Sequence, residues 1–371
     1  MTKVAAGYFH SLFLKSDGSL WVIGDNEFGQ LGDGTYNTTN RSEQIVASGV
    51  TVTAAGGWFS LFLKSDNSLW AMGYNNSGQL GDGTYTAGTN QPEQTLASNV
   101  MTIAGGEYHS LFLKSDGSLW AMGFNLYGQL GDGNYKFSTN LPVQIVSSGV
   151  TAIAAGAYHS LFLESDGSLW AMGYNNDGQL GDGTYNKTNQ PEQIVASNVT
   201  AIAAGAYYSL FLKSDGSLWA MGDNQYGQLG DGGYNGTNQP EQIVASGVTA
   251  IAGGAYHSLF LKSDGSLWAM GYNNDGQLGD GTFNNTNRPE QIVAGPPGYN
   301  QISIQLLSGG NVSLSYVGIA GTNYALDQSF TLSPANWMPL ATNPAGTDGV
   351  LMFTNTPDPA TNHFWRIRSV P

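Results

Sequence analysis

The chain has 371 residues, of which 41% are apolar and 11% charged, so it can bury a large core and should not be disordered. Its formal charge of −15, from 12 basic and 27 acidic residues, disfavours nucleic acid and anionic membrane surfaces as partners. It has no apolar run long enough to span a membrane, and the lack of cysteine excludes disulfides, thiolate metal sites and cysteine catalysis. We therefore expect no nucleic-acid partner and no membrane insertion.

One unit of about 50 residues is repeated six times between the N-terminus and residue 295. A tryptophan marks the same place in every copy: Trp21, Trp70, Trp120, Trp170, Trp219 and Trp268. The surrounding text is nearly constant, and in the sixth copy it reads AYHSLFLKSDGSLWAMGYNNDGQLGDG and then PEQIVA. Internal repeats with a period of roughly 20 to 50 residues are typical of propellers and solenoids, in which each repeat forms one supersecondary unit.

Each copy begins with a predicted hairpin. In the first copy Asp17-Gly18 is expected to be a two-residue turn with positive φ, and Asn67 takes the glycine's place in the second copy. The flanking runs, LFL and LWVI in the first copy, are apolar on both faces. We therefore expect both strands, with their tryptophan, to be buried between stacked sheets.

A glycine-rich loop and two further strands complete each copy. The leucine of GQLGDG is expected to pack into the core, and QIVA and VTAIAAG are predicted strands. Residues 2–7 match the VTAIAAG strand, which the sixth copy lacks, so the N-terminal segment is expected to complete the last blade. The fold class is thus all-β: a β-propeller of six four-stranded blades, with seven blades less favoured.

The repeated motifs G-x-Y-H-S-L, D-G-S-L-W-A-M-G and N-x-x-G-Q-L-G-D-G resemble the regulator of chromosome condensation repeat family over residues 1 to about 295. The resemblance implies a propeller that acts through protein contacts, since members include nucleotide-exchange factors and a secreted bacterial inhibitor of β-lactamases. The best-known members have seven blades. Because the C-terminal segment contains no GQLGDG text, it is not expected to supply a seventh blade of the same kind.

Beyond residue 295 the repeat text stops. Residues 296–300 are predicted to be a linker, and residues 301–371 a small β-sandwich-like module of six strands: QISIQLL, NVSLSYVG, NYALDQS, WMPLAT, GVLMFTN and HFWRIRSV. The text from Tyr324 to Val370 is similar to C-terminal β modules of large exported bacterial proteins. That resemblance implies an extracellular or cell-surface place in a bacterium. No signal peptide is visible, and a cytoplasmic place stays open.

Histidine, aspartate and tryptophan recur in the copies, but none is expected to be catalytic. His10, His109, His159 and His257 share a position that Phe59 and Tyr208 fill elsewhere, which favours packing over a metal ring. The aspartate of each GDG offers too few oxygens for calcium and is expected to shape a turn: Asp33, Asp82, Asp132, Asp182, Asp231 and Asp280. No nucleophile, zinc or phosphate motif is present, so we expect no enzyme, no metal and no cofactor.

The copies differ from one another in two stretches, the four residues before GQLGDG and the polar stretch after it. Both are rich in tyrosine, asparagine and threonine, a composition typical of binding loops with aromatic anchors. The predicted binding residues are Phe28, Tyr74, Phe124, Tyr127, Tyr174, Asp223, Tyr226 and Tyr272. Simple solubility of exposed loops is the alternative explanation.

We therefore predict a monomeric, non-enzymatic scaffold that presents these loops to a protein partner. A carbohydrate-binding propeller is the first alternative, because repeated tyrosines and asparagines would give multivalent glycan binding. A structural adhesin or spacer is the second, because near-identical copies need no dedicated site.

Overall fold

The computed structural model describes residues 1–294 and six later segments, 302–306, 312–317, 323–329, 338–344, 350–355 and 364–370. Two compact units are distinguished, residues 1–260 with 268–290 and residues 261–267 with 291–371. The described residues contain strands and no helix, and hence no helix capable of crossing a membrane. The predicted linker, residues 296–300, lies outside the described residues.

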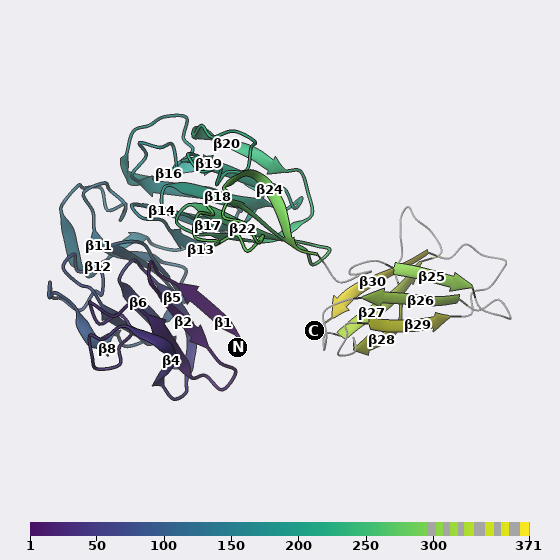
Figure 1. Cartoon of the computed structure of the whole chain (residues 1–371), viewed down its shortest axis with the longest axis horizontal. Coiled ribbons are helices and arrows are strands. Elements are labelled where there is room, and N and C mark those ends of the chain that lie inside the picture. The colour runs from purple at the N-terminus through teal and green to yellow at the C-terminus, as the bar shows by residue number, and fades with distance from the viewer. Residues whose placement is uncertain are drawn as a thin grey trace. The chain divides into compact units, whose positions relative to one another are not determined.

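The repeat region forms six four-stranded antiparallel sheets, each with its strands in chain order, which are the six predicted blades (Figure 1). Blade one contains β1 (Lys3–Ala6), β2 (His10–Leu14), β3 (Leu20–Gly24) and β4 (Thr39–Val46). Blade two contains β5 (Val50–Ala55), β6 (Phe59–Lys64), β7 (Leu69–Gly73) and β8 (Thr89–Leu96). Blade three contains β9 (Val100–Gly105), β10 (His109–Lys114), β11 (Leu119–Phe124) and β12 (Ser138–Val146).

The last three blades repeat this arrangement. Blade four contains β13 (Val150–Ala155), β14 (His159–Glu164), β15 (Leu169–Gly173) and β16 (Thr188–Val195). Blade five contains β17 (Val199–Ala204), β18 (Tyr208–Lys213), β19 (Leu218–Gly222) and β20 (Thr237–Val244). Blade six contains β21 (Val248–Gly253), β22 (His257–Lys262), β23 (Leu267–Gly271) and β24 (Thr286–Val293).

The expectation that the N-terminal strand completes the last blade is wrong. β1 pairs with β2 in the first blade, and the VTAIAAG strand opens each blade instead of closing the one before it. A tight turn explains the pairing, because the Gly7 N–H bonds the His10 carbonyl oxygen (2.9 Å). Closing this short loop costs less chain entropy than pairing with a strand nearly 300 residues away.

The hairpin between the second and third strands also differs from its prediction. Lys15 N–H bonds Ser19 O (3.1 Å) and Gly18 N–H bonds Lys15 O (3.0 Å), so the loop has three residues and not two. Only its last residue has positive φ, 77° at Gly18 and 62° at Asn67. This is the three-residue loop in which a glycine or asparagine closes the turn.

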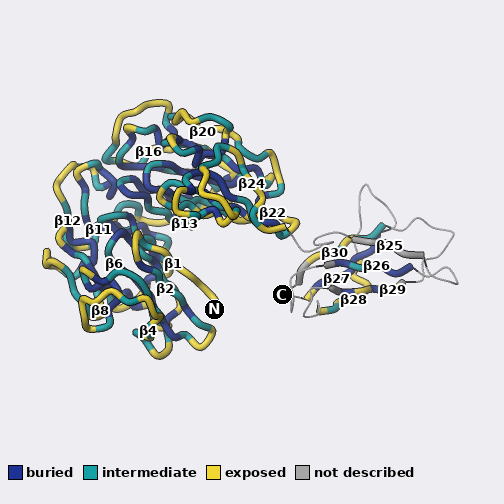
Figure 2. The backbone as a smooth tube through the Cα atoms, viewed as in Figure 1, coloured by how far each residue is buried: buried dark blue, intermediate teal, exposed yellow. Residues whose placement is uncertain are grey.

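Each core cluster of the propeller spans two consecutive blades, and Figure 2 shows the buried residues running through the strands of the blades. Leu161, Leu163 and Leu180 of blade four pack with Phe211 and Met221 of blade five. The GQLGDG leucines belong to these clusters as predicted, with exposures of 0–2%: Leu31, Leu80, Leu130, Leu180, Leu229 and Leu278.

The five junctions between consecutive blades repeat one set of hydrogen bonds. A serine hydroxyl donates to a glutamine backbone oxygen of the blade before it, as Ser60 does to Gln30 (2.7 Å) and Ser209 to Gln179 (2.8 Å). A loop glycine N–H bonds an asparagine oxygen of the blade after it, as Gly34 does with Asn90 (2.8 Å). The blades are therefore joined by one repeated interface.

The first and last blades each leave half of this interface uncovered, and we call these halves the open faces. Ser11, Phe13 and Ile23 of blade one are partly exposed, although their equivalents in the other blades are buried. Gln277 of blade six is also partly exposed, whereas its equivalents are fully buried: Gln30, Gln79, Gln129, Gln179 and Gln228. Within the described residues, five equal junctions thus produce an arc whose ends do not meet.

The C-terminal segment contains the six predicted strands, arranged as two three-stranded sheets. One sheet has β25 (Ile302–Leu306), β26 (Val312–Val317) and β29 (Val350–Asn355), and the other has β27 (Asn323–Ser329), β28 (Met338–Pro344) and β30 (Phe364–Val370). Residues of both sheets share one core cluster, among them Leu314, Phe353, Tyr324 and Leu326. No four-stranded blade forms among the described residues of this segment.

Candidate functional site

The two variable stretches lie at the same end of the blades. Strand direction alternates within each blade, so the turn between the first two strands and the loop between the last two project from one end. In blade four these are residues 156–158 and 174–187. We call this end the loop face, and its position follows from the order of the strands.

The first turn of blades two to six places an aromatic side chain on the loop face. These residues stand directly before the histidine position and are half-buried: Trp58, Tyr108, Tyr158, Tyr207 and Tyr256. Consecutive rings contact each other from blade to blade, with centroids 5.3 Å apart for Trp58 and Tyr108 and 6.1 Å for Tyr158 and Tyr207. The series is therefore continuous across five blades.

Seven of the eight predicted binding residues pack around this inner series. Pairs from neighbouring blades meet edge to face, with centroid distances of 4.9 Å for Phe28–Tyr74, 5.0 Å for Tyr127–Tyr174 and 4.9 Å for Tyr226–Tyr272. Phe124 contacts Tyr108 and Tyr158. We call the inner series and these seven residues the aromatic band.

The eighth predicted residue, Asp223, helps to build its loop. Its carboxylate accepts hydrogen bonds from the Gln228 side-chain amide (2.9 Å) and from the Gln225 backbone (3.1 Å). Asp25 holds Gln30 in the same way in blade one. Asp223 nevertheless remains half-buried on the loop face beside the band.

Glu107 places a half-buried carboxylate among the rings of the band. The Tyr8 hydroxyl donates to its Oε2 (2.8 Å), and Glu107 raises the pKa of Tyr8, Tyr108 and Tyr158 in addition to their burial. Burial raises the pKa of Glu107 itself, against the hydrogen bonds from these tyrosines. In blade two the same position is Gly57, where a Cβ would lie 2.9 Å from the Glu107 carbonyl oxygen.

The recurrent histidines are packing and hydrogen-bonding residues, as expected. Nε2 of His109 lies 2.9 Å from Ser160 Oγ and Nε2 of His159 lies 2.9 Å from Ser209 Oγ, so each bond joins two blades. Burial lowers the pKa of His109 and His159 to about 3. Both rings are therefore neutral at physiological pH.

The GDG aspartates shape their loops, also as expected. Asp182 accepts from the Asn175 side chain (3.0 Å) and the Thr184 N–H (2.8 Å), while the Asn175 side-chain oxygen accepts from Leu180 N–H (3.0 Å). Among the residues that the structure describes, no group of three His, Cys, Asp or Glu side chains is placed to hold a metal.

The tryptophans are less buried than predicted, and in four of the six blades one ring face packs on a phenylalanine while a lysine covers the ring. Trp70 stacks on Phe62 (6.1 Å), its Nε1 donates to Ser68 Oγ (2.9 Å), and Lys64 Nζ lies 3.6 Å from its ring centroid. Trp21, Trp120 and Trp219 repeat the lysine contact at 3.5–4.0 Å. These contacts form beside the hairpin turns, at the end opposite the loop face.

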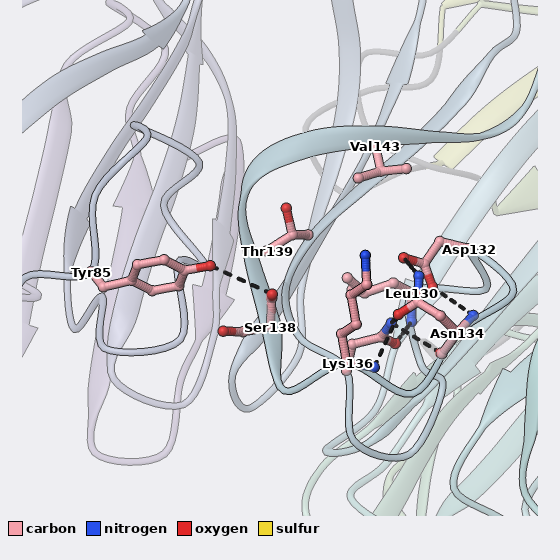
Figure 3. A pocket seen from close by; sticks show the side chains of 9 residues that line it. Tyr85, Leu130, Asp132, Asn134, Lys136, Ser138, Thr139 and Val143 are labelled. Carbon is pink, nitrogen blue, oxygen red and sulfur yellow. Dashed lines mark hydrogen bonds between the residues drawn. The ribbon is translucent and has the colours of Figure 1, made fainter.

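A small cavity of about 190 Å³ lies between the loops of blades two and three (Figure 3). Its polar lining residues bond within their own loops, as Asn125 does with Asp132 (2.8 Å), and Tyr85 bonds the Ser138 oxygen (3.4 Å). The cavity thus holds few free polar groups, and the aromatic band is the more prominent feature of the loop face.

Sequence reasoning missed the inner aromatic series, Tyr8 and Glu107. The signal was present, because a tyrosine stands before the histidine position in four consecutive copies, from Tyr108 to Tyr256. In the sequence this tyrosine is part of the constant repeat motif and not of a variable stretch. Only the direction of the strands shows that its turn lies beside the variable loop.

Comparison with known proteins identifies the repeat architecture. A family model described as RCC1-like domain matches residues 1–197 and 45–324. The X-linked retinitis pigmentosa GTPase regulator homolog of Caenorhabditis elegans is 54% identical over 39 residues, which are 10% of this chain and 3% of that protein.

Solved structures share the fold at low identity. The crystal structure of human WBSCR16 has a TM-score of 0.71 and 23% identity, covering 85% of this chain and 84% of that one. Prp20p from Saccharomyces cerevisiae has a TM-score of 0.70 and 24% identity, covering 81% and 78% of the two chains. With its repeat text, blades and family-model match taken together, this chain belongs to the RCC1-like domain family.

Proposed function

We propose that the chain is a non-enzymatic protein-binding scaffold whose contact surface is the aromatic band. The observation that carries the proposal is the continuity of half-buried aromatic rings across the loop face, from Phe28 to Tyr272. Contiguous exposed apolar surface of this kind marks interaction sites, whereas scattered apolar residues do not. Tyrosine and tryptophan also supply much of the binding energy at protein interfaces.

The family supports protein binding as the use of this fold. Prp20p from yeast has binding properties to Gsp1p and histones, and a chain of a further structure, Kap60 bound to yeast RCC1 (Prp20), matches with a TM-score of 0.69. These partners belong to those proteins. The similarity of the C-terminal text to modules of exported bacterial proteins supports an extracellular place for the interaction.

A glycan is the weaker alternative because a sugar stacks on an open ring face. Tyr74, Tyr174 and Tyr272, three tyrosines of the band that a sugar would have to stack on, each meet a neighbouring ring at interplanar angles of 69–71°. These edge-to-face contacts leave a corrugated surface instead of flat separate platforms. Such a surface fits the side chains of a protein better.

The test compares two double variants of the immobilised full-length protein. Tyr127→Ala with Tyr174→Ala removes a contacting pair of the band, and Tyr185→Ala with Tyr234→Ala removes two tyrosines that are each 53% exposed on outer loops. Both variants and the wild type are exposed to envelope proteins and to a glycan array, and bound material is identified by mass spectrometry. We expect one protein to be retained by the wild type and the control but bound at least tenfold more weakly by the band variant.

Retention of that protein by all three forms would contradict the band as the contact surface. Retention of glycans alone, lost with the band variant, would replace the protein partner with a sugar.

A further inference from the structure

The junction between blades four and five carries two carboxylates where three other junctions carry aromatic pairs. Phe28–Tyr74, Tyr127–Tyr174 and Tyr226–Tyr272 occupy equivalent positions in the repeat and meet across their junctions. The same two positions at the fourth junction are Asp177 and Asp223. A Cβ on Gly236 would lie 3.5 Å from both the Asp177 carbonyl oxygen and the Asp223 Cα, so the two acidic residues stand close together. Burial and then the charge of Asp223 raise the pKa of Asp177.

Two rings of the band, Tyr207 and Tyr256, are close enough to these carboxylates for the negative charges to raise their pKa. The pKa of Tyr207 is raised to about 12 by burial and then by Glu107, with a further contribution from Asp177. Burial, Tyr226 and Asp223 raise the pKa of Tyr256, and Glu107 and Asp177 add to the effect. Three carboxylates from three blades thus act on one stretch of the band.

No basic side chain of the described residues neutralises this stretch. Among the described residues the Asp177 carboxylate has no hydrogen bond or ion pair. Within this part of the chain the Asp223 carboxylate accepts hydrogen bonds only from the Gln228 side-chain amide and the Gln225 backbone N–H of its own loop. Elsewhere several aromatic rings are covered by lysines of the chain itself. Lys64 lies over Trp70, and Lys187 lies 5.5 Å from Tyr127 at the neighbouring junction.

The chemistry of this stretch fits an organic cation better than a metal. Calcium needs six or more oxygens in close coordination, and no group of three acidic or histidine side chains in the described part of the chain converges on one point. A guanidinium or ammonium group needs a single carboxylate and gains from a ring face beside it. Its long stem can also lie along the band.

We propose that the stretch of the aromatic band at Asp177, Tyr207 and Asp223 receives an arginine or lysine side chain of the protein partner. This inference rests on the proposed function, since it gives the chemistry of the group that the partner inserts. It further assigns specificity to one junction of the six repeats, where an acidic group would be repelled and a neutral group would leave the two carboxylates without a counter-charge.

The test uses Asp177→Asn, with Asp275→Asn as its matched control. Both aspartates end the same YNND text, and Asp275 is exposed on the last blade, so the two variants lose equal charge. The probe is the blocked peptide Gly-Arg-Gly-Arg-Gly, with citrulline in place of arginine as the neutral form, titrated calorimetrically at low salt. We expect the arginine peptide to bind Asp177→Asn roughly tenfold more weakly than Asp275→Asn, and the citrulline peptide not to bind.

Equal weakening in both variants would overturn the inference, because the peptide would then respond only to net charge. Binding that required added calcium would overturn it in favour of a metal. Binding of the partner protein captured by the wild type separates this inference from the proposed function. If the Tyr127 and Tyr174 double variant loses that partner while Asp177→Asn binds it fully, the band binds protein but no basic side chain enters at Asp177. If neither variant loses the partner, both the proposed function and this inference fail.

Discussion

With His10, His109 and His159 replaced by tyrosine, the protein is expected to lose much less stability between about pH 6.5 and 4.5 than the wild type does. These rings are 0–3% exposed, and burial lowers the pKa of His10 to about 4 and of the other two to about 3. In the unfolded chain histidine titrates near 6.5, so on acidification the unfolded state binds protons first. The free energy of unfolding therefore falls as the pH drops below about 6.5, by about 2 to 3 kcal/mol for each histidine at pH 4.5.

Tyrosine is the suitable replacement because blade five already uses it. Tyr208 is fully buried at this position, where its hydroxyl lies 3.0 Å from Ser258 Oγ and donates to Gly254 O (3.2 Å). The measurement is urea unfolding of wild type and triple variant at about pH 7.5 and 4.5, a range that lies above the ordinary pKa of aspartate and glutamate, whose remaining protonation is common to both proteins. His257→Tyr is the control, since His257 is partly exposed and should change the pH dependence least. An equal acid sensitivity in the triple variant and the wild type would show that the buried histidines are not its source.

A chain with a seventh copy of the repeat is expected to be more stable than the six-copy chain. A duplicate of residues 199–247, inserted before Val248, would add one more junction of the kind already repeated five times. With seven blades the open faces can meet, which would bury Phe13, Ile23 and their partners on blade six. Burying apolar side chains contributes about 1.5 to 3 kcal/mol each, so several kcal/mol are expected.

The readouts for this insertion are the thermal midpoint and binding of a dye that reports exposed apolar surface. The control keeps six copies but replaces blade four with a duplicate of blade five, so that the sequence changes without an added blade. We expect the seven-copy chain to melt several degrees higher and bind less dye than either six-copy chain. An unchanged midpoint with unchanged dye binding would mean that the open faces do not form a junction.

Local features of the fold could be predicted from the sequence because each depends on a few neighbouring residues. The period indicated the number of blades, and the apolar leucine of GQLGDG indicated its place in the core. The predicted place of the N-terminal strand is wrong because this segment could pair either with the strand that follows it or with the last blade. A periodic sequence carries no marker of where one repeat unit ends and the next begins. The turn between Ala6 and His10 decides it.

The candidate site was predictable only in part, for a geometric reason. Phe28, Tyr74 and Tyr174 could be chosen because they vary between copies and lie in loops. Glu107 and Tyr158 stand in a separate motif about 16 to 20 residues earlier in each copy, and antiparallel strands bring the two motifs together. The burial of tryptophan was overestimated because a lysine that covers a ring looks, in sequence, like an ordinary exposed charge.

The central claim is that a protein partner touches the aromatic band, and site-specific photocrosslinking tests it most directly. A photoreactive phenylalanine analogue would replace Phe124 in the band or Tyr185 on an outer loop, both in the full-length protein. We predict a covalent product with one partner protein from position 124 and none from position 185. A product from position 185 alone, or a product with a glycan from position 124, would contradict the account.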